Sequence, residues 1–100
     1  MPFVTAKVNV PVNKEQELKI KSWLGKAIEH VPGKNENCLL FGIEDDYHFY
    51  LRGDGEQKIA YIEVDIFGNE DHMGFDLFGV EITAIFHQAL GISPENIYQI

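Results

Sequence analysis

The sequence predicts an α/β (α+β) fold of two tandem βαβ units, with a four-stranded mixed sheet and two helices on one face. Short apolar stretches of strand type alternate with two long stretches of helical periodicity. The two units end alike, since GKNENCLL closes the first and GISPENIYQI closes the second. A parallel βαβ crossover is right-handed, which puts both helices on one face of the sheet. A chain of 100 residues has the size of one domain, so we expect a single domain over residues 1–100.

The first unit begins with a strand in which apolar and polar residues alternate. Its apolar side chains share one face: Val4, Ala6, Val8 and Val10. Pro11 ends the strand, and Asn13 is the expected N-cap of a helix, with Gln16 three residues later. The helix carries an apolar stripe: Ile20, Trp23, Leu24, Ala27, Ile28 and Val31. The pair Pro32-Gly33 ends this helix.

The middle of the chain predicts short elements. Residues 38–43 form an apolar run that predicts a more buried strand. We then expect a turn at residues 44–46, a brief strand at residues 49–51 and a hairpin-type turn at residues 53–55.

The second unit starts with a strand over residues 59–67 and a loop over residues 68–74. A second helix is predicted by apolar residues at helical spacing: Phe75, Phe78, Ile82, Ile85, Phe86 and Ala89. Gly91 is the expected helix C-cap, and residues 97–100 predict the last strand. Because both helices cover one face, the other face is left bare, and a bare face predicts a homo-oligomer.

The composition excludes several classes of function. Hydrophobic residues make up 45% of the chain and aromatic residues 12%, while the formal net charge is −8. That charge disfavours nucleic acid and anionic membrane surfaces as partners, because binding them requires lysine and arginine. No apolar run approaches the roughly 20 residues of a membrane span. There is no signal-peptide pattern at the start, so we expect a cytoplasmic protein.

Few side chains suggest a cofactor or a reactive group. Cys38 lies in an apolar run and is expected to be an inert thiol rather than a nucleophile. The acidic stretches at residues 44–48 and 70–72 contain histidine but lack metal-ligand spacing, so no metal and no cofactor is expected. Arg52 could meet a substrate carboxylate, and a solvated or ion-paired arginine is the alternative.

Pro2 is open to two interpretations. As part of the chain, it is a rigid start to an edge strand, where its missing N–H does no harm. If Met1 is removed, Pro2 carries a free secondary amine that can act as a base.

Three stretches together resemble the tautomerase superfamily, the family of macrophage migration inhibitory factor. They are the opening PFVTAKVNVP, the pair Gly33-Lys34 after the first helix, and the tail LGISPENIYQI. The likeness covers nearly the whole chain in order and spacing. It implies a homotrimer in which the three sheets line a central barrel and the helices lie outside.

The resemblance also implies an activity, the keto–enol tautomerisation of small aryl α-keto acids such as phenylpyruvate-like compounds. Pro2 would be the catalytic base after loss of Met1, and Lys34 beside it would hold the substrate carboxylate or a developing enolate. Phe67 would contribute a backbone N–H to the substrate, and Tyr98 would reach in from the neighbouring subunit. Apolar surroundings and the Lys34 cation would both lower the pKa of the prolyl amine.

Two other functions remain open. One is a non-catalytic trimer of the same fold that acts as a binding or signalling protein. The other is a ferredoxin-like regulatory module for a small ligand, usually a monomer or dimer, which the same order of strands and helices also fits.

Overall fold

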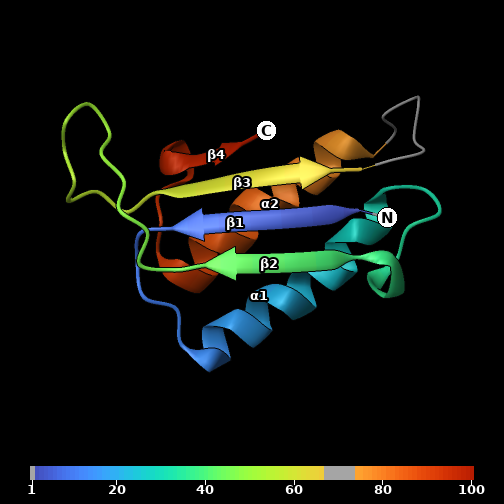
Figure 1. Ribbon diagram of the computed structural model, residues 1–100. Coiled ribbons are helices and arrows are strands. Elements are labelled where there is room, and N and C mark those ends of the chain that lie inside the picture. Colours follow the sequence, from blue (N-terminus) through green and yellow to red (C-terminus); the bar gives the residue numbers. More distant parts are fainter. Residues whose placement is uncertain (1, 67–73) are drawn as a thin grey trace.

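The computed structural model describes residues 2–66 and 74–100, and Figure 1 shows a mixed sheet with both helices behind it. The elements in chain order are β1 (Phe3–Val8), α1 (Lys14–Ala27), β2 (Leu40–Glu44), β3 (Ala60–Asp65), α2 (Phe75–Leu90) and β4 (Ile97–Gln99). Within these described residues, three short 3₁₀ helices lie between them: η1 (Ile28–His30), η2 (Glu36–Cys38) and η3 (Pro94–Asn96). The strand order is β2-β1-β3-β4, parallel within each βαβ unit and antiparallel between β1 and β3. The predicted fold class is confirmed.

Buried and half-buried residues alternate along β1, as the sequence predicts. Val4, Ala6 and Val8 are fully buried beneath the helices. The strand ends at Val8, earlier than the alternation suggests, and it is followed by Asn9, whose side chain bonds to the backbone of the segment before β3. Asn9 Nδ2 donates to the Gln57 carbonyl at 2.7 Å, and Asn9 Oδ1 accepts from the Ile59 N–H at 2.7 Å.

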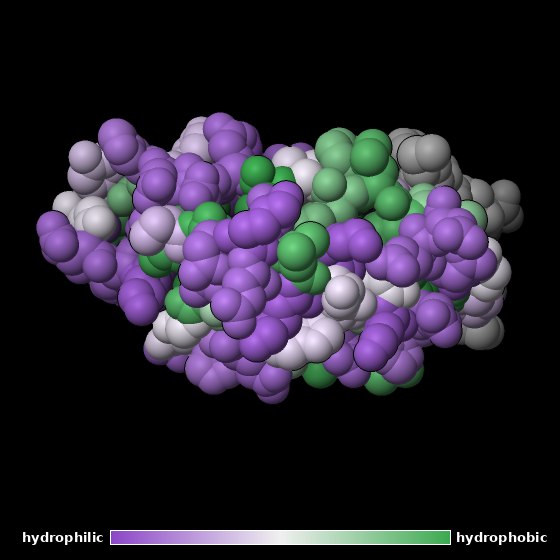
Figure 2. Space-filling model, turned by 90° about the horizontal axis from the view of Figure 1, so that it is seen from below, coloured by the Kyte–Doolittle hydropathy of each residue, from purple (hydrophilic) through white to green (hydrophobic). Residues whose placement is uncertain are grey.

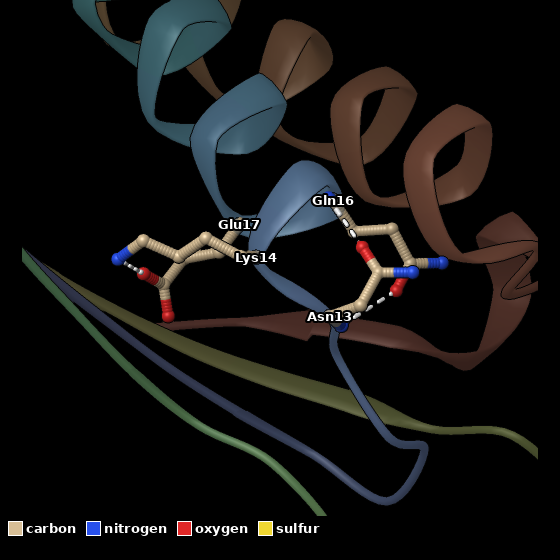
Figure 3. A network of polar contacts seen from close by, with 4 residues as sticks. All are labelled: Asn13, Lys14, Gln16 and Glu17. Carbon is tan, nitrogen blue, oxygen red and sulfur yellow. Dashed lines mark hydrogen bonds and ion pairs between the residues drawn. The ribbon is translucent and has the colours of Figure 1, made fainter.

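The start of α1 is fixed by its own sequence. Asn13 Oδ1 accepts from the Gln16 N–H at 2.8 Å, and Gln16 Oε1 accepts from the Asn13 N–H at 3.0 Å, which is a capping box. Figure 3 shows both bonds, together with the ion pair between Lys14 and Glu17. The predicted N-cap is therefore confirmed. The α-helix ends at Ala27, and η1 continues the chain to His30.

The strand predicted at residues 38–43 is shifted and is less buried than expected. Asn35 caps η2 by accepting a hydrogen bond from the Asn37 N–H at 2.9 Å, so Cys38 lies in a 3₁₀ turn rather than in a strand. The strand β2 begins at Leu40 and lies at the edge of the sheet, where its residues are half-buried or exposed.

Residues 45–58 project beyond the strands, at the left of Figure 1, and we call them the arm. The strand expected at residues 49–51 is absent, because only Leu51 and Asp54 pair, each donating to the other at 2.9 Å. The turn lies at Arg52 and Gly53, not at residues 53–55. Their φ angles of 52° and 81° give the doubly left-handed turn that suits a tight hairpin.

The second helix and the core also match the prediction. The core side chains of α2 are Phe78, Ile82, Ile85, Phe86 and Leu90, and they pack with those of α1 and β1 in one cluster. Gly91 ends α2 in the left-handed conformation, with a φ of 72°. The expected C-cap is therefore confirmed.

The sheet face away from the helices is not simply apolar. The strand registers place on it Phe3, Thr5, Lys7, Leu40, Gly42, Glu44, Tyr61, Glu63, Asp65 and Tyr98. Charged side chains mixed with aromatic ones can face water. The bare face is therefore a weaker argument for an oligomer than the sequence alone suggested.

Candidate functional site

Pro2 lies at one end of the sheet in a fully buried position. Its carbonyl oxygen accepts a hydrogen bond from the Leu40 N–H at 2.9 Å, which holds the start of the chain against β2. On the other side of β1, Phe3 lies opposite Asp65 of β3. The burial suits both interpretations of Pro2. A proline amide has no N–H to leave unsatisfied, and a buried amine loses solvation of its charged form.

A tight turn brings Lys34 to the same end of the molecule. The Lys34 N–H donates to the Val31 carbonyl at 3.1 Å, and the central residues are Pro32 and Gly33, with a φ of 78° at Gly33. Proline followed by a left-handed glycine is the pattern of a type II turn. Lys34 is half-buried. Figure 1 shows the connection from α1 to β2 passing close to the start of β1.

The first turn of α2 packs against the same region by a close approach of two backbones. Gly74, the N-cap of α2, has a φ of 82°. A Cβ atom at this position would collide with the carbonyl oxygen of His30 and would lie 3.2 Å from Val31 Cα. Only glycine therefore fits. Because Val31 opens the turn that carries Lys34, the docking of α2 also fixes the position of Lys34.

An apolar cavity of about 370 Å³ lies between the end of β3 and the first turns of α2. Its lining residues are Val64, Asp65, Ile66, Phe75, Phe78, Gly79, Ile82, Gln99 and Ile100. Sequence patterns predicted the helix residues among them as core, and Phe78 and Ile82 are indeed buried. The cavity itself had no signal in the sequence, because its lining comes from the end of β3, the first turns of α2 and residues 99–100, which are far apart in the chain.

Tyr98 lies away from Pro2 within one chain. It is on the sheet face opposite the helices, across from Tyr61, which is in turn across from Lys7. Strand geometry puts about 17 Å between the levels of Pro2 and Lys7 along β1. A single chain does not bring Tyr98 to Pro2, and the resemblance placed this tyrosine in the site of a neighbouring subunit.

Arg52 lies in the turn of the arm between Leu51 and Asp54, and Figure 1 shows the arm at the opposite end of the sheet from the start of β1. The turn that presents it is held by Asp54, which accepts from the Glu56 N–H at 2.8 Å and from Gln57 Nε2 at 3.2 Å. Because these bonds favour the ionised form, the pKa of Asp54 is lowered from its ordinary value of 3.8, first by the Glu56 N–H and then by Gln57. Within one chain, Arg52 therefore lies far from the other candidate site residues, Pro2 and Lys34.

The remaining candidate, Phe67, lies outside the described residues, as does the acidic stretch at residues 70–72, so its role stays a prediction. Cys38 is half-buried. Over residues 2–66 and 74–100, no group of three or more histidine, cysteine, aspartate or glutamate side chains could hold a metal ion. Within the same described part of the chain, no helix is both long and apolar enough to cross a membrane.

No protein-family model matches this chain, and no curated protein does. Solved structures match nearly all of it. MIF2 of Leishmania major has a TM-score of 0.89 at 22% identity, covering 100% of this chain and 85% of that one. Fused 4-OT, a symmetric trimer, has a TM-score of 0.84 at 12% identity, covering 98% of this chain and 83% of that one.

A third structure is that of Pt0534 inactivated by 2-oxo-3-pentynoate. It has a TM-score of 0.81 at 11% identity, with 97% of this chain and 80% of that one covered. Identities this low show a shared fold and nothing finer. This chain therefore has the tautomerase-superfamily fold of macrophage migration inhibitory factor homologues and of 4-OT, as its sequence motifs indicate.

Proposed function

We propose that this protein is a keto–enol tautomerase for small aryl α-keto acids, with Pro2 as the general base after removal of Met1. The full burial of Pro2 at the start of β1, in a tautomerase fold, carries the proposal. Burial disfavours the charged amine and so leaves more of the neutral base at physiological pH. In the enol-to-keto direction, the Pro2 nitrogen takes the proton of the enol hydroxyl and returns a proton to the carbon next to the keto group, so substrate and product have the same atoms and Pro2 ends neutral.

Lys34 is the proposed partner for negative charge. It is half-buried at the same end of the molecule as Pro2, where a cation can hold the substrate carboxylate or the developing enolate. A nearby cation also lowers the pKa of the Pro2 amine, in the same direction as burial. The backbone N–H of Phe67 is proposed as a further donor to the substrate, on the resemblance alone.

The α-keto acid class has independent support from one structural neighbour. The compound that inactivated Pt0534, 2-oxo-3-pentynoate, is an α-keto acid with an alkyne next to the keto group. An amine can add to such an alkyne, which is the reactivity expected of a neutral prolyl nitrogen. The apolar cavity of about 370 Å³ is lined by neither Pro2 nor Lys34, but one of its lining residues, Asp65, pairs with Phe3, which follows Pro2, so this cavity is the proposed place for the aryl group.

The proposed active form is a homotrimer. Fused 4-OT is a symmetric trimer of the same fold, and a second subunit is needed if Tyr98 is to reach a Pro2 site. The sheet has two edge strands, β2 and β4, that can accept a neighbour. Figure 2, seen from the α1 and β2 side, shows separate hydrophobic areas within a hydrophilic surface. Beside β2, Leu18 and Leu40 are about half exposed, at 49% and 50%.

The decisive experiment combines an intact mass with an assay. We expect the untagged protein to lack Met1 and to convert enol-phenylpyruvate to its keto form. Pro2→Gly should lose about 100-fold in rate, since general acid–base catalysis contributes on that order. Pro94→Gly, a proline exchange at the exposed start of η3, is the matched control and should keep full activity. Unchanged activity in Pro2→Gly, or Met1 retained on every chain, would contradict the proposal.

Two further measurements separate the alternatives. Incubation with 2-oxo-3-pentynoate should add the mass of one inhibitor to Pro2 and none to Pro2→Gly. The solution mass should be near three times 11.4 kDa. A trimer that retains Met1 would be the non-catalytic alternative, whereas a monomer or dimer would favour the ferredoxin-like regulatory module.

A further inference from the structure

A surface groove of about 390 Å³ lies between α1 and α2, the two helices behind the sheet in Figure 1, and we call it the helix groove. Its lining residues are Trp23, Lys26, Ala27, His30, Glu81, Ala84, Ile85 and Gln88. Neither Pro2 nor Lys34 is among these residues, so the helix groove is distinct from the proposed tautomerase site. In the proposed trimer the sheets face inward and the helices lie outside, which leaves the helix groove open to solvent.

The shape of the helix groove comes from small side chains between the helices. Ala27 and Ala84 both line the groove, and their side chains end at Cβ, so space is left where longer side chains would fill it. Ile85, which is 4% exposed, gives the groove an apolar floor. Trp23 is half-buried and adds an aromatic wall. Such a surface suits a flat apolar group such as a phenyl ring.

Two polar contacts join the walls of the helix groove. Near the start of α1, Gln16 Nε2 donates to the Ala89 carbonyl at 3.4 Å. Just after the end of α1, His30 Nε2 lies 3.6 Å from Glu81 Oε1 of α2. Because the two helices are already held together, a ligand would pay little conformational entropy to order the walls.

Cations gather on the α1 side of the helix groove, although the net charge of the chain is −8. Half of the eight lysine and arginine residues lie in α1: Lys14, Lys19, Lys21 and Lys26. Lys26 lines the groove, and within residues 2–66 and 74–100 its ammonium has no ion-pair or hydrogen-bond partner. Lys19 Nζ lies 5.7 Å from the centroid of the Trp23 ring, so a second ammonium lies at the aromatic wall. This side of the groove therefore attracts an anion.

We propose that the helix groove binds a small aromatic carboxylate. The ring of the ligand lies against Trp23 and Ile85, and its carboxylate meets the ammonium of Lys26. A cationic ligand is disfavoured because Lys19 and Lys26 repel it, and an uncharged ring leaves Lys26 without a partner. The Glu81 carboxylate is a like charge in the same groove, so it lowers the affinity. The site does not depend on the proposed tautomerase function.

The test compares phenylacetate with phenylacetamide, a neutral molecule of nearly the same shape. Each is titrated into the full chain at constant pH and ionic strength and followed by NMR. The chain has one tryptophan, so the indole N–H of Trp23 gives a single resonance that reports on the groove. We expect saturable shifts of this resonance and of residues 81–88 with phenylacetate, and binding about three-fold weaker with phenylacetamide. Shifts at Phe3 and Lys34 report the proposed tautomerase site separately.

Matched variants separate a site from general charge. Lys26→Gln should weaken phenylacetate binding about three-fold, and Glu81→Gln should strengthen it about two-fold because a like charge is removed. Lys14→Gln and Glu95→Gln make the same charge changes at exposed positions outside the groove and should leave binding unchanged. Equal affinity for phenylacetate and phenylacetamide would overturn the proposal. So would equal weakening by Lys14→Gln and Lys26→Gln, or the absence of any shift at Trp23.

Discussion

The two βαβ units share one plan, yet their helices begin in different ways. The first helix, α1, starts at a capping box made by Asn13 and Gln16, two side chains three residues apart. The second helix, α2, starts at Gly74, which makes no side-chain cap. Its conformation is fixed instead by the carbonyl of His30, far away in the sequence. One helix start is therefore encoded locally, and the other is set by tertiary contact.

The closing strands differ in a similar way. Beside β2, the apolar side chains Phe41 and Ile43 form a hollow with Leu18 of α1. In the second unit, Gln99 of β4 joins the sheet to α2, since its Nε2 donates at 2.8 Å to both the Gly79 carbonyl and Thr83 Oγ1. The second unit thus has side-chain hydrogen bonds between its closing strand and its helix. The second unit also carries the cavity.

The largest expected effect comes from a substitution at Gly74, where α2 begins against the backbone of His30. Gly74→Ala should lower the free energy of unfolding by about 3 kcal/mol, because it combines a left-handed φ with a backbone collision. Gly91→Ala is the matched control. It has a similar φ of 72° but its nearest neighbour, Lys58 Nζ, is 3.6 Å away, so it should cost only about 1 kcal/mol. Urea unfolding measures both, and equal losses would show that the contact with His30 is unimportant.

The second-largest expected effect comes from a substitution in the capping box at the start of α1. Asn13→Ala should cost about 1 kcal/mol, because the Gln16 N–H loses its acceptor at the helix start. Asn37→Ala, the same exchange at an exposed position of η2, should change the free energy of unfolding by less than about 0.5 kcal/mol. If the two variants unfold at the same urea concentration, the capping box contributes nothing.

A smaller effect tests the link between β4 and α2. Gln99→Leu should cost about 0.5–1 kcal/mol, since it removes two hydrogen bonds on a partly exposed surface. A double-mutant cycle with Thr83→Val isolates the bond between the two side chains. Strictly additive losses in that cycle would show that the bond to Thr83 adds no stability.

The smallest effect concerns the arm between the two units, and it depends on pH. The pKa of Asp54 is lowered in the folded protein, so its ionised form adds stability above its ordinary value of 3.8. That contribution is lost as the pH falls through the lowered folded value. We therefore expect Asp54→Asn to lower the Tm at pH 7 and to match the unmodified chain near about pH 2. Asp65→Asn, an exposed strand position, is the control, and a Tm difference that is constant with pH would contradict the assignment.

The sequence by itself determined the order of the elements, the faces of β1 and α2, the caps at Asn13 and Gly91, and the resemblance to the tautomerase superfamily. These features depend on neighbours a few residues apart, because strand and helix periods and capping bonds act over a turn or less. The resemblance named Pro2 and Lys34 as candidates, whereas their surroundings depend on contacts between segments that are distant in the chain.

Only the tertiary structure decided which segments meet. It moved the strand of residues 38–43 to a half-buried edge, replaced the expected strand at residues 49–51 by an arm, and separated Arg52 and Tyr98 from Pro2 within one chain. It also created the cavity beside α2 and the close approach at Gly74. These features arise from backbone pairs distant in sequence, and side-chain periodicity carries no information on which distant backbones touch.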